Sequence, residues 1–230
     1  MDPGEAQFAR LDRFAELMAG AADAVPLDQA ALAMSAVLRS KPTDDALVAL
    51  DELAAGCADA TLDGVRRHLY EELGFHGDGR DYDHPRNSML DVVVERRRGL
   101  PILLATVLIE VGRRAGVPIV GVGMPLHFLA RDGHDADAFV DPFTGEALDR
   151  LAARQRFETL SGGRLAWEDR HLAPTPSRLI VVRMLANLRA AYARRQDRLG
   201  VALVAKMRAA IPELAPRATA EAARLGGVLN

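Results

Sequence analysis

The sequence contains very little cysteine, no excess of positive charge and no long apolar run. Its single cysteine, Cys57, excludes an internal disulfide framework and a cysteine-rich zinc site. The net charge of -3 argues against general binding to a phosphate backbone, which requires a basic excess on at least one face. The longest apolar run is too short to cross a bilayer, and the N-terminal residues lack the apolar segment of a signal peptide. We therefore expect a cytoplasmic protein that binds neither nucleic acid nor membranes.

Apolar residues are abundant and recur at helical spacing through most of the first hundred positions. They make up 49% of the 230 residues, so the chain can bury a core and form one or two domains. The spacing predicts four short helices, followed by an irregular segment at 75–86 that is rich in Gly, Asp and Pro. Asn87 or Ser88 is then placed to cap a helix that runs to Arg97 and stops at Gly99.

A strongly apolar helix is predicted from Pro101 to Ala115. Apolar residues occupy nearly every side of it, which is typical of a helix at the centre of a core. Proline suits its first turn because the N–H at that position has no intrahelical partner. The pattern then changes to period two, which predicts strands within 119–123, 126–131 and 138–143. A helix on a small antiparallel sheet, preceded by a helical subdomain, indicates an α+β protein.

A helical tail is predicted after the strands. Its apolar stripe consists of Leu179, Val182, Leu185, Leu188 and Tyr192. We expect this tail to pack on the rest of the protein or to present a groove to a partner. The predicted organisation is a helical N-terminal segment at 1–86, an α+β core at 87–160 and the helical tail at 161–230.

The hairpin formed by the last two predicted strands brings a histidine close to an aspartate. If residues 132–136 form a five-residue loop centred on His134, His127 lies directly opposite Asp141. Cross-strand Cβ atoms are roughly 4.5 to 5.5 Å apart, which allows an imidazole–carboxylate hydrogen bond. We therefore expect an oriented histidine. Three roles remain open for the pair: a buried structural contact, a ligand site in a former enzyme, or an acid–base pair that works with a different partner.

The run from Leu69 to Asp149 resembles the SirB-type branch of the transglutaminase-like superfamily. The resemblance rests on YEELGF, HPRNSMLDVVVERRRGLPILLATVLIEVGRRAGVPIVGVGMPLHFLAR and FVDPFTGEAL. It implies a papain-like core in which a cysteine begins the central helix and the following strands supply His and Asp. Those two residues correspond to His127 and Asp141, and Gly-Leu-Pro stands where catalytic members have Gly-x-Cys. Residues 1–68 resemble the family's helical N-terminal segment, and the tail resembles the tetratricopeptide-like helices that often follow its core.

Pro101 therefore occupies the position of the nucleophile. A helix start activates cysteine by stabilising its thiolate, whereas proline has neither a nucleophilic atom nor an N–H. The other hydroxyl and thiol groups are poorly placed. Cys57 is interpreted as a small apolar residue of the N-terminal helices. Thr106 lies about 140° around the helix from Pro101, at roughly 100° per residue, and so points elsewhere. Ser88 is weighed as a substitute nucleophile against a role as a helix cap.

Two charged clusters are further candidates. An anion could be held beside the start of the apolar helix by Arg96, Arg97 and Arg98, although arginines at a helix C-terminus also balance its dipole. A second cluster consists of His76, Asp78, Asp81, Asp83 and His84. Its spacing fits no ordered ligand loop, so a solvated acidic turn is favoured over a metal site, and we expect no metal and no cofactor.

The sequence thus favours a protein that has lost covalent chemistry and acts as a binding or regulatory module. The predicted ligand site is a cleft at the start of the 101–115 helix, next to the residues His127 and Asp141. The partner is expected to be a protein or peptide, or a small anion held by Pro101, Arg96, Arg97, Arg98, Asn87 and Ser88. Two alternatives remain: a hydrolase or amide transferase that uses the His–Asp pair without a cysteine, and an assembly scaffold that acts through the tail.

Overall fold

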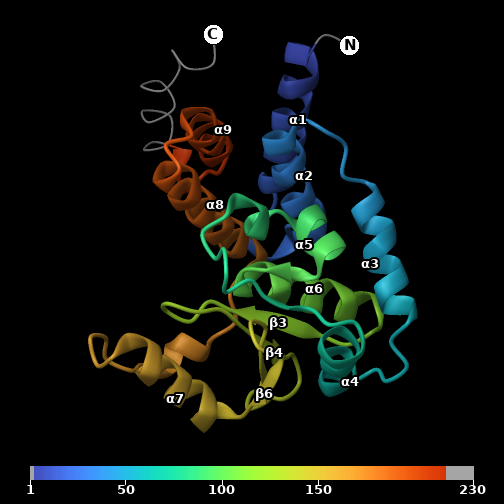
Figure 1. Cartoon of the computed structure of the whole chain (residues 1–230), viewed down its shortest axis with the longest axis vertical. Helices are drawn as coiled ribbons and strands as arrows, with labels where there is room; N and C mark the ends of the chain where they lie inside the picture. The colour runs from blue at the N-terminus through green and yellow to red at the C-terminus, as the bar shows by residue number, and fades with distance from the viewer. Residues whose placement is uncertain (1–2, 216–230) are drawn as a thin grey trace.

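The computed structural model describes residues 3–215 and has an upper helical layer and a lower layer built on a sheet (Figure 1). The N-terminal helices are α1 (Pro3–Met18), α2 (Leu27–Arg39), α3 (Asp45–Ala55) and α4 (Leu62–Arg66), the last continuing into the π-helical turn η2 (Arg67–Glu72). These are the four short helices that the spacing predicts. No helix among residues 3–215 is long and apolar enough to cross a membrane.

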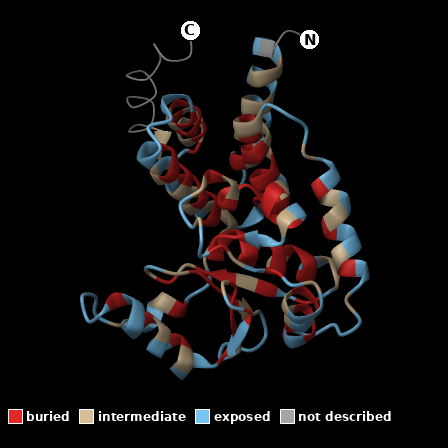
Figure 2. Ribbon diagram, in the orientation of Figure 1, coloured by how far each residue is buried: buried red, intermediate tan, exposed pale blue. Residues whose placement is uncertain are grey.

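The central element is α6 (Pro101–Arg114), which begins at the predicted residue and ends one residue early. It lies between the sheet on one side and α3 and α5 (Leu90–Arg96) on the other (Figure 1). Eleven of its residues are buried, as expected for a helix that is apolar on nearly every side. Figure 2 shows the buried residues concentrated where this helix meets both layers. Each large side chain buried there contributes about 1.5–3 kcal/mol to the free energy of unfolding.

The sheet is four-stranded and antiparallel, in the order β3-β4-β5-β6. Its strands are β3 (Ile119–Val122), β4 (Leu129–Asp132), β5 (Phe139–Asp141) and β6 (Glu146–Leu148). Three of these, β3, β4 and β5, overlap the predicted strand regions, and β6 is additional. Together with the helices, the sheet confirms the α+β class.

The predicted register of the β4–β5 hairpin is wrong. Arg131 pairs with Phe139, so the turn is centred on Asp135 and not on His134. The cause is the Asp132 carboxylate, which accepts the N–H groups of His134 (2.7 Å) and Asp135 (3.1 Å) and closes the turn later in the chain. The strand also starts only at Leu129, which leaves the residues before it in an irregular loop.

The segment between the N-terminal helices and α6 differs from the prediction in three ways. Within the segment expected to be irregular, β1 (His76–Gly77) pairs in parallel with β2 (Arg98–Gly99). Asn87 and Ser88 do not cap α5 but belong to the 3-10 turn η3 (Pro85–Ser88). The helix α5 ends at Arg96, one residue before the predicted end, and Arg97, with a left-handed φ of 56°, caps it in place of Gly99.

The C-terminal helices pack onto the N-terminal ones. After α7 (Arg150–Ser161) and the turn η4 (Asp169–Leu172), α8 (Ser177–Arg194) and α9 (Arg198–Ala209) lie against α2, and α9 also contacts α1 (Figure 1). Most of the predicted stripe of α8 is buried. The tail thus docks onto the rest of the protein, as one of the two expectations had it. The boundaries at 86 and 160 stay predictions, and residues 216–230 of the predicted tail lie outside the described residues.

Candidate functional site

His127 and Asp141 are joined by a hydrogen bond, although the two residues do not face each other across the hairpin. The Nε2 atom of His127 lies 2.9 Å from Oδ1 of Asp141. His127 precedes β4 in the irregular loop, and Asp141 is the last residue of β5. The predicted contact therefore forms through a different backbone arrangement, in which the loop folds the imidazole back toward the end of the neighbouring strand.

Asp141 has no exposed surface, and its carboxylate accepts three hydrogen bonds. Besides His127, the Phe143 N–H donates to Oδ1 at 2.9 Å, and Arg156 of α7 donates to Oδ2 at 2.6 Å. Burial by itself would raise the pKa of Asp141, but the hydrogen bond and charge of His127, helped by Phe143 and Arg156, lower that pKa below its ordinary value. The carboxyl is therefore ionised at neutral pH and acts as an acceptor.

An ionised acceptor on one ring nitrogen fixes the tautomer of His127. The Nε2 atom carries the proton that is donated to Asp141, so Nδ1 is a free acceptor in the neutral ring. No hydrogen bond to Nδ1 occurs among residues 3–215. The orientation is the one that a general base requires: one nitrogen held, and the other available to a ligand.

Arg183 of α8 holds the loop that carries His127. Its guanidinium donates to the carbonyl oxygens of Met124 at 2.9 Å and His127 at 2.6 Å, and it lies 5.5 Å from the centre of the Phe128 ring. Burial lowers the pKa of Arg183 from its ordinary value. In the same loop Leu126 has a φ of +67°, a conformation that costs a leucine roughly 1–2 kcal/mol. The tail helix thus stabilises a strained backbone next to the imidazole.

A hollow of about 180 Å³ lies beside the His127 ring at the start of α6. Its lining consists of Tyr82, Pro101, Ile102, Leu126, His127, Phe128, Arg183 and Asn187. No cysteine, serine or threonine belongs to that lining. Within the described part of the chain the Ile102 N–H has no hydrogen-bond acceptor, whereas the Leu103 N–H donates to the Leu100 carbonyl at 3.0 Å. The polar side chains of the lining are those of Tyr82, His127, Arg183 and Asn187, and the Ile102 N–H at the start of α6 is an unpaired backbone donor among the described residues.

The other predicted binding residues do not line this hollow. Arg96 donates to Asn87 Oδ1 and to Asp78 Oδ2, both at 2.9 Å, and Asn87 Nδ2 donates to the Asp81 carbonyl at 2.7 Å. Arg97 donates to the Leu73 carbonyl at 2.9 Å. The two contacts of Arg96 fasten the segment at 78–87 to α5, and that of Arg97 fastens Leu73 to the end of the same helix. Arg98 is exposed in β2. Ser88 is buried in η3, so a ligand that enters from solvent has little access to it.

The remaining candidates from the sequence lie away from the His–Asp pair. Cys57 is partly buried between α3 and α4 and donates to the Asp59 carbonyl at 3.4 Å. The Thr106 hydroxyl donates to the Ile102 carbonyl at 2.8 Å inside the core. In the acidic turn, Asp78 and Asp81 pair with arginines. Across residues 3–215 no group of three His, Cys, Asp or Glu side chains is arranged to hold a metal ion.

Four contributors to the site were not identified from the sequence: Tyr82, Arg156, Arg183 and Asn187. The two arginines come from α7 and α8, and Tyr82 comes from the acidic turn. Each reaches the site only through tertiary packing, so neither periodicity nor local spacing indicates it. A possible signal for Arg183 was its position on the core-facing helix α8, where a charged residue needs a buried acceptor.

Comparison with known proteins places this geometry in a family. Residues 24–186 match the model of the transglutaminase-like superfamily. A UPF0162 protein of Xylella fastidiosa is 46% identical over 135 residues, which cover 56% of this chain and 48% of the relative. A UPF0162 protein of Pseudomonas aeruginosa is 34% identical over 140 residues, covering 61% of this chain and 50% of the relative. This chain thus spans about half the length of these curated relatives.

A eukaryotic protein shares a shorter region. The mouse F-box only protein 21 is 39% identical over 70 residues, which cover 30% of this chain and 11% of that protein. No solved structure matches the chain. The match at 24–186 contains every residue that lines the hollow except Asn187, and it also contains Asp141, which holds His127. The chain belongs to the transglutaminase-like superfamily, as its resemblance to the SirB-type branch predicted.

Proposed function

We propose that this protein is a binding module of the transglutaminase-like superfamily, which holds a peptide end or a small anion without covalent chemistry in the hollow at the start of α6. The observation that supports this most is the lining itself. Pro101 stands beside the oriented His127, and no side chain of cysteine, serine or threonine lines the hollow. An acyl intermediate formed as in papain-like enzymes needs the thiol or hydroxyl of such a residue within hydrogen-bond reach of the base.

The chemistry of the hollow favours a carboxylate or an amide carbonyl as the bound group. The Ile102 N–H lies at the positive end of α6 and lacks an acceptor among the described residues. Burial raises the pKa of the Tyr82 hydroxyl, which therefore stays protonated and can donate. A volume of about 180 Å³ suits one terminal group or one side chain, but not a folded domain.

The strained loop supports the same proposal. Leu126 is 54% exposed, so its left-handed backbone conformation is not explained by burial of its side chain. Strain of this kind persists only where surrounding contacts enforce it, and it is common at ligand-binding sites. Here Arg183 enforces it from α8, with the result that the imidazole faces the hollow.

The test is a screen for ligands by thermal stability and NMR, with a matched pair of histidine variants. Peptides with a free carboxylate, peptide amides and small anions would be added to the wild type, His127→Ala and His134→Ala. His134 lies exposed in the β4–β5 turn, away from the hollow. We expect a ligand whose stabilising effect is lost in His127→Ala and retained in His134→Ala. Equal binding by all three proteins would contradict the proposal.

A second candidate is hydrolysis or amide transfer in which the His–Asp pair activates water or an amine directly. The free Ile102 N–H favours it, since it could stabilise an oxyanion. An oxyanion hole usually has two donors, but the Leu103 N–H already donates to the Leu100 carbonyl. The support for this candidate is therefore weaker than that for binding. Amide hydrolysis that depends on His127 and turns over many times would establish this candidate.

The scaffold hypothesis is the least supported of the three. The apolar face of α8 packs on the core, and Arg183 of the same helix holds the His127 loop. Removing the tail would therefore disturb the hollow as well as any surface on α8. A test of the scaffold hypothesis needs substitutions of exposed tail residues, such as Leu199, in place of a truncation.

A further inference from the structure

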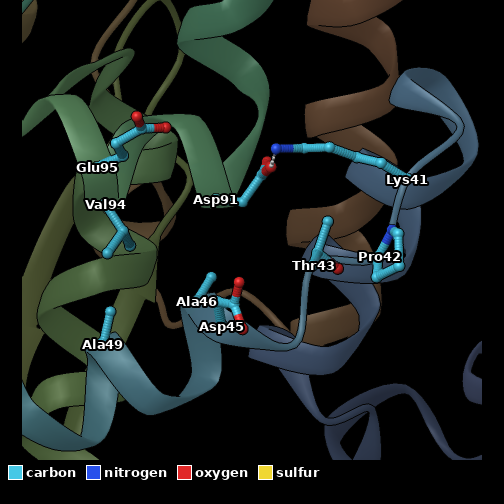
Figure 3. A pocket seen from close by; sticks show the side chains of 9 residues that line it. All are labelled: Lys41, Pro42, Thr43, Asp45, Ala46, Ala49, Asp91, Val94 and Glu95. Carbon is cyan, nitrogen blue, oxygen red and sulfur yellow. Dashed lines mark ion pairs between the residues drawn. The ribbon is translucent and has the colours of Figure 1, made fainter.

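A second concave surface lies between α3 and α5, separate from the hollow at α6 (Figure 3). It consists of two adjoining pockets of about 430 and 390 Å³, which share Ala49, Val94 and Glu95. We call these two pockets together the α3–α5 groove. It is open because α3 presents alanines at 46 and 49 toward α5, and these small side chains leave the space between the helices unfilled.

The groove carries an excess of negative charge. The carboxylates of Asp45, Glu52, Asp91 and Glu95 belong to its lining, against the cationic groups of Lys41 and Arg97. Arg97 is already engaged with the Leu73 carbonyl. Within residues 3–215 no ion pair or side-chain hydrogen bond is made by Asp45, Glu52 or Glu95. These three carboxylates are therefore available to a positively charged group from outside.

Asp91 gives a second, independent indication of a ligand. Its side chain is 9% exposed and points from α5 toward Lys41 across the first pocket (Figure 3). Oδ2 is paired with Arg39, whereas Oδ1 is buried and has no hydrogen-bond partner among the described residues. A buried carboxylate oxygen without a donor is unfavourable, and native proteins rarely leave one unsatisfied.

Lys41 does not satisfy this need. Its Nζ lies 3.9 Å from Oδ2, and its side chain is 49% exposed. An ion pair at that distance to a half-exposed lysine contributes little to stability, so the ammonium is easily displaced. A cationic group that enters from the groove could take its place and donate to Asp91, with Glu95 and Asp45 at the opening.

We propose that the α3–α5 groove binds a basic peptide segment of a partner, with a Lys or Arg side chain directed at Asp91 and small apolar side chains over Ala46, Ala49 and Val94. The excess of negative charge favours a cationic ligand, and the volume of the groove favours a ligand larger than a single amine. Together the two pockets have the volume of a site for a drug-sized ligand, most of which an ammonium ion would leave empty. This proposal does not depend on the function of the hollow at α6.

The test measures binding of peptides to the full chain by fluorescence anisotropy. The probes are an array of labelled twelve-residue peptides that carry a central Lys or Arg among Ala and Val, and a matched array with Glu at that place. We expect saturable binding in the first array alone. The charge variant Asp45→Asn/Glu95→Gln should weaken it by roughly three- to tenfold, as expected for two partly exposed ion pairs.

Two further variants test whether the binding depends on the groove. The variant Asp12→Asn/Asp23→Asn removes the same charge from exposed positions on other elements and should bind like the wild type. Ala49→Leu places a bulkier side chain in both pockets at a helical position, where leucine is nearly as favourable as alanine, and should reduce binding at least tenfold without loss of folding.

Three outcomes would overturn the proposal. The first is an absence of saturable binding by the basic array. The second is equal weakening by the two charge variants, which would indicate long-range attraction without a site. The third is that spermidine displaces the labelled peptide from the wild type and from Ala49→Leu alike. This would indicate a small amine as the ligand in place of a peptide.

Discussion

Replacement of Asp141 by alanine should lower the free energy of unfolding by about 3–5 kcal/mol, because it removes the acceptor of the His127 Nε2–H, of the Phe143 N–H and of one N–H of Arg156, which keeps its contact with Glu146. Asp141 is fully buried, so water cannot replace the lost contacts. For a protein of this size the change corresponds to a decrease in Tm of roughly 6–20 °C. The matched control is Asp137→Ala, which removes an exposed aspartate paired with Arg150 at 2.7 Å and should cost less than about 1 kcal/mol.

The pH dependence of this difference can also be predicted. The folded-state pKa of Asp141 is lowered, so its stabilising contribution is present above the unfolded pKa and is lost as pH falls through the folded pKa. Urea unfolding of the wild type and of Asp141→Ala should therefore give a constant difference near neutral pH that shrinks below about pH 4. A difference under 1 kcal/mol at pH 7, equal to that of Asp137→Ala, would refute the assignment of a buried and ionised carboxylate.

Three further predictions concern other parts of the molecule. A Cβ at Gly77 would lie 2.1 Å from the Phe143 ring, so Gly77→Ala should cost about 1–3 kcal/mol by urea unfolding, whereas Gly79→Ala, with its nearest contact at 3.9 Å, should cost less. Burial raises the pKa of the Glu110 carboxyl, so its stabilising contribution is lost as pH rises through the folded pKa, and Glu110→Gln should gain Tm relative to the wild type between about pH 4 and pH 7. Pro101→Cys, with the native cysteine replaced by serine, should be alkylated by iodoacetamide with a midpoint below about pH 8.5, since the helix start stabilises a thiolate; a midpoint above that value would contradict the proposed polarity of the site.

The elements that local patterns control were predictable from the sequence. The helix α6 is apolar on nearly every side, which indicated its central position, and the proline at its first turn indicated its start. The end of α5 was not predictable in the same way. Arg97 takes the left-handed conformation expected of a glycine, and its guanidinium is held by the carbonyl of Leu73, 24 residues earlier in the chain.

In the candidate site, too, local patterns were predictable from the sequence and tertiary contacts were not. The proximity of His127 and Asp141 followed from a hairpin, even though the register was wrong because Asp132 closes the turn later. The residues that fix the pair, Arg156 and Arg183, come from helices that reach it through tertiary packing. Such contacts have no periodic signal, because one side chain at one position makes them. The α3–α5 groove likewise depends on two helices that are distant in the sequence.

The most direct test of non-covalent binding in the hollow is an intact-mass measurement after incubation with activated peptide esters. The wild type, His127→Ala and Pro101→Cys would be compared, because only the last has a nucleophile at the start of α6. The account predicts one additional acyl group on Pro101→Cys and no adduct on the wild type that depends on His127. An acyl adduct on the wild type that disappears in His127→Ala would contradict it, since the protein would then perform covalent chemistry with a nucleophile other than a cysteine at position 101.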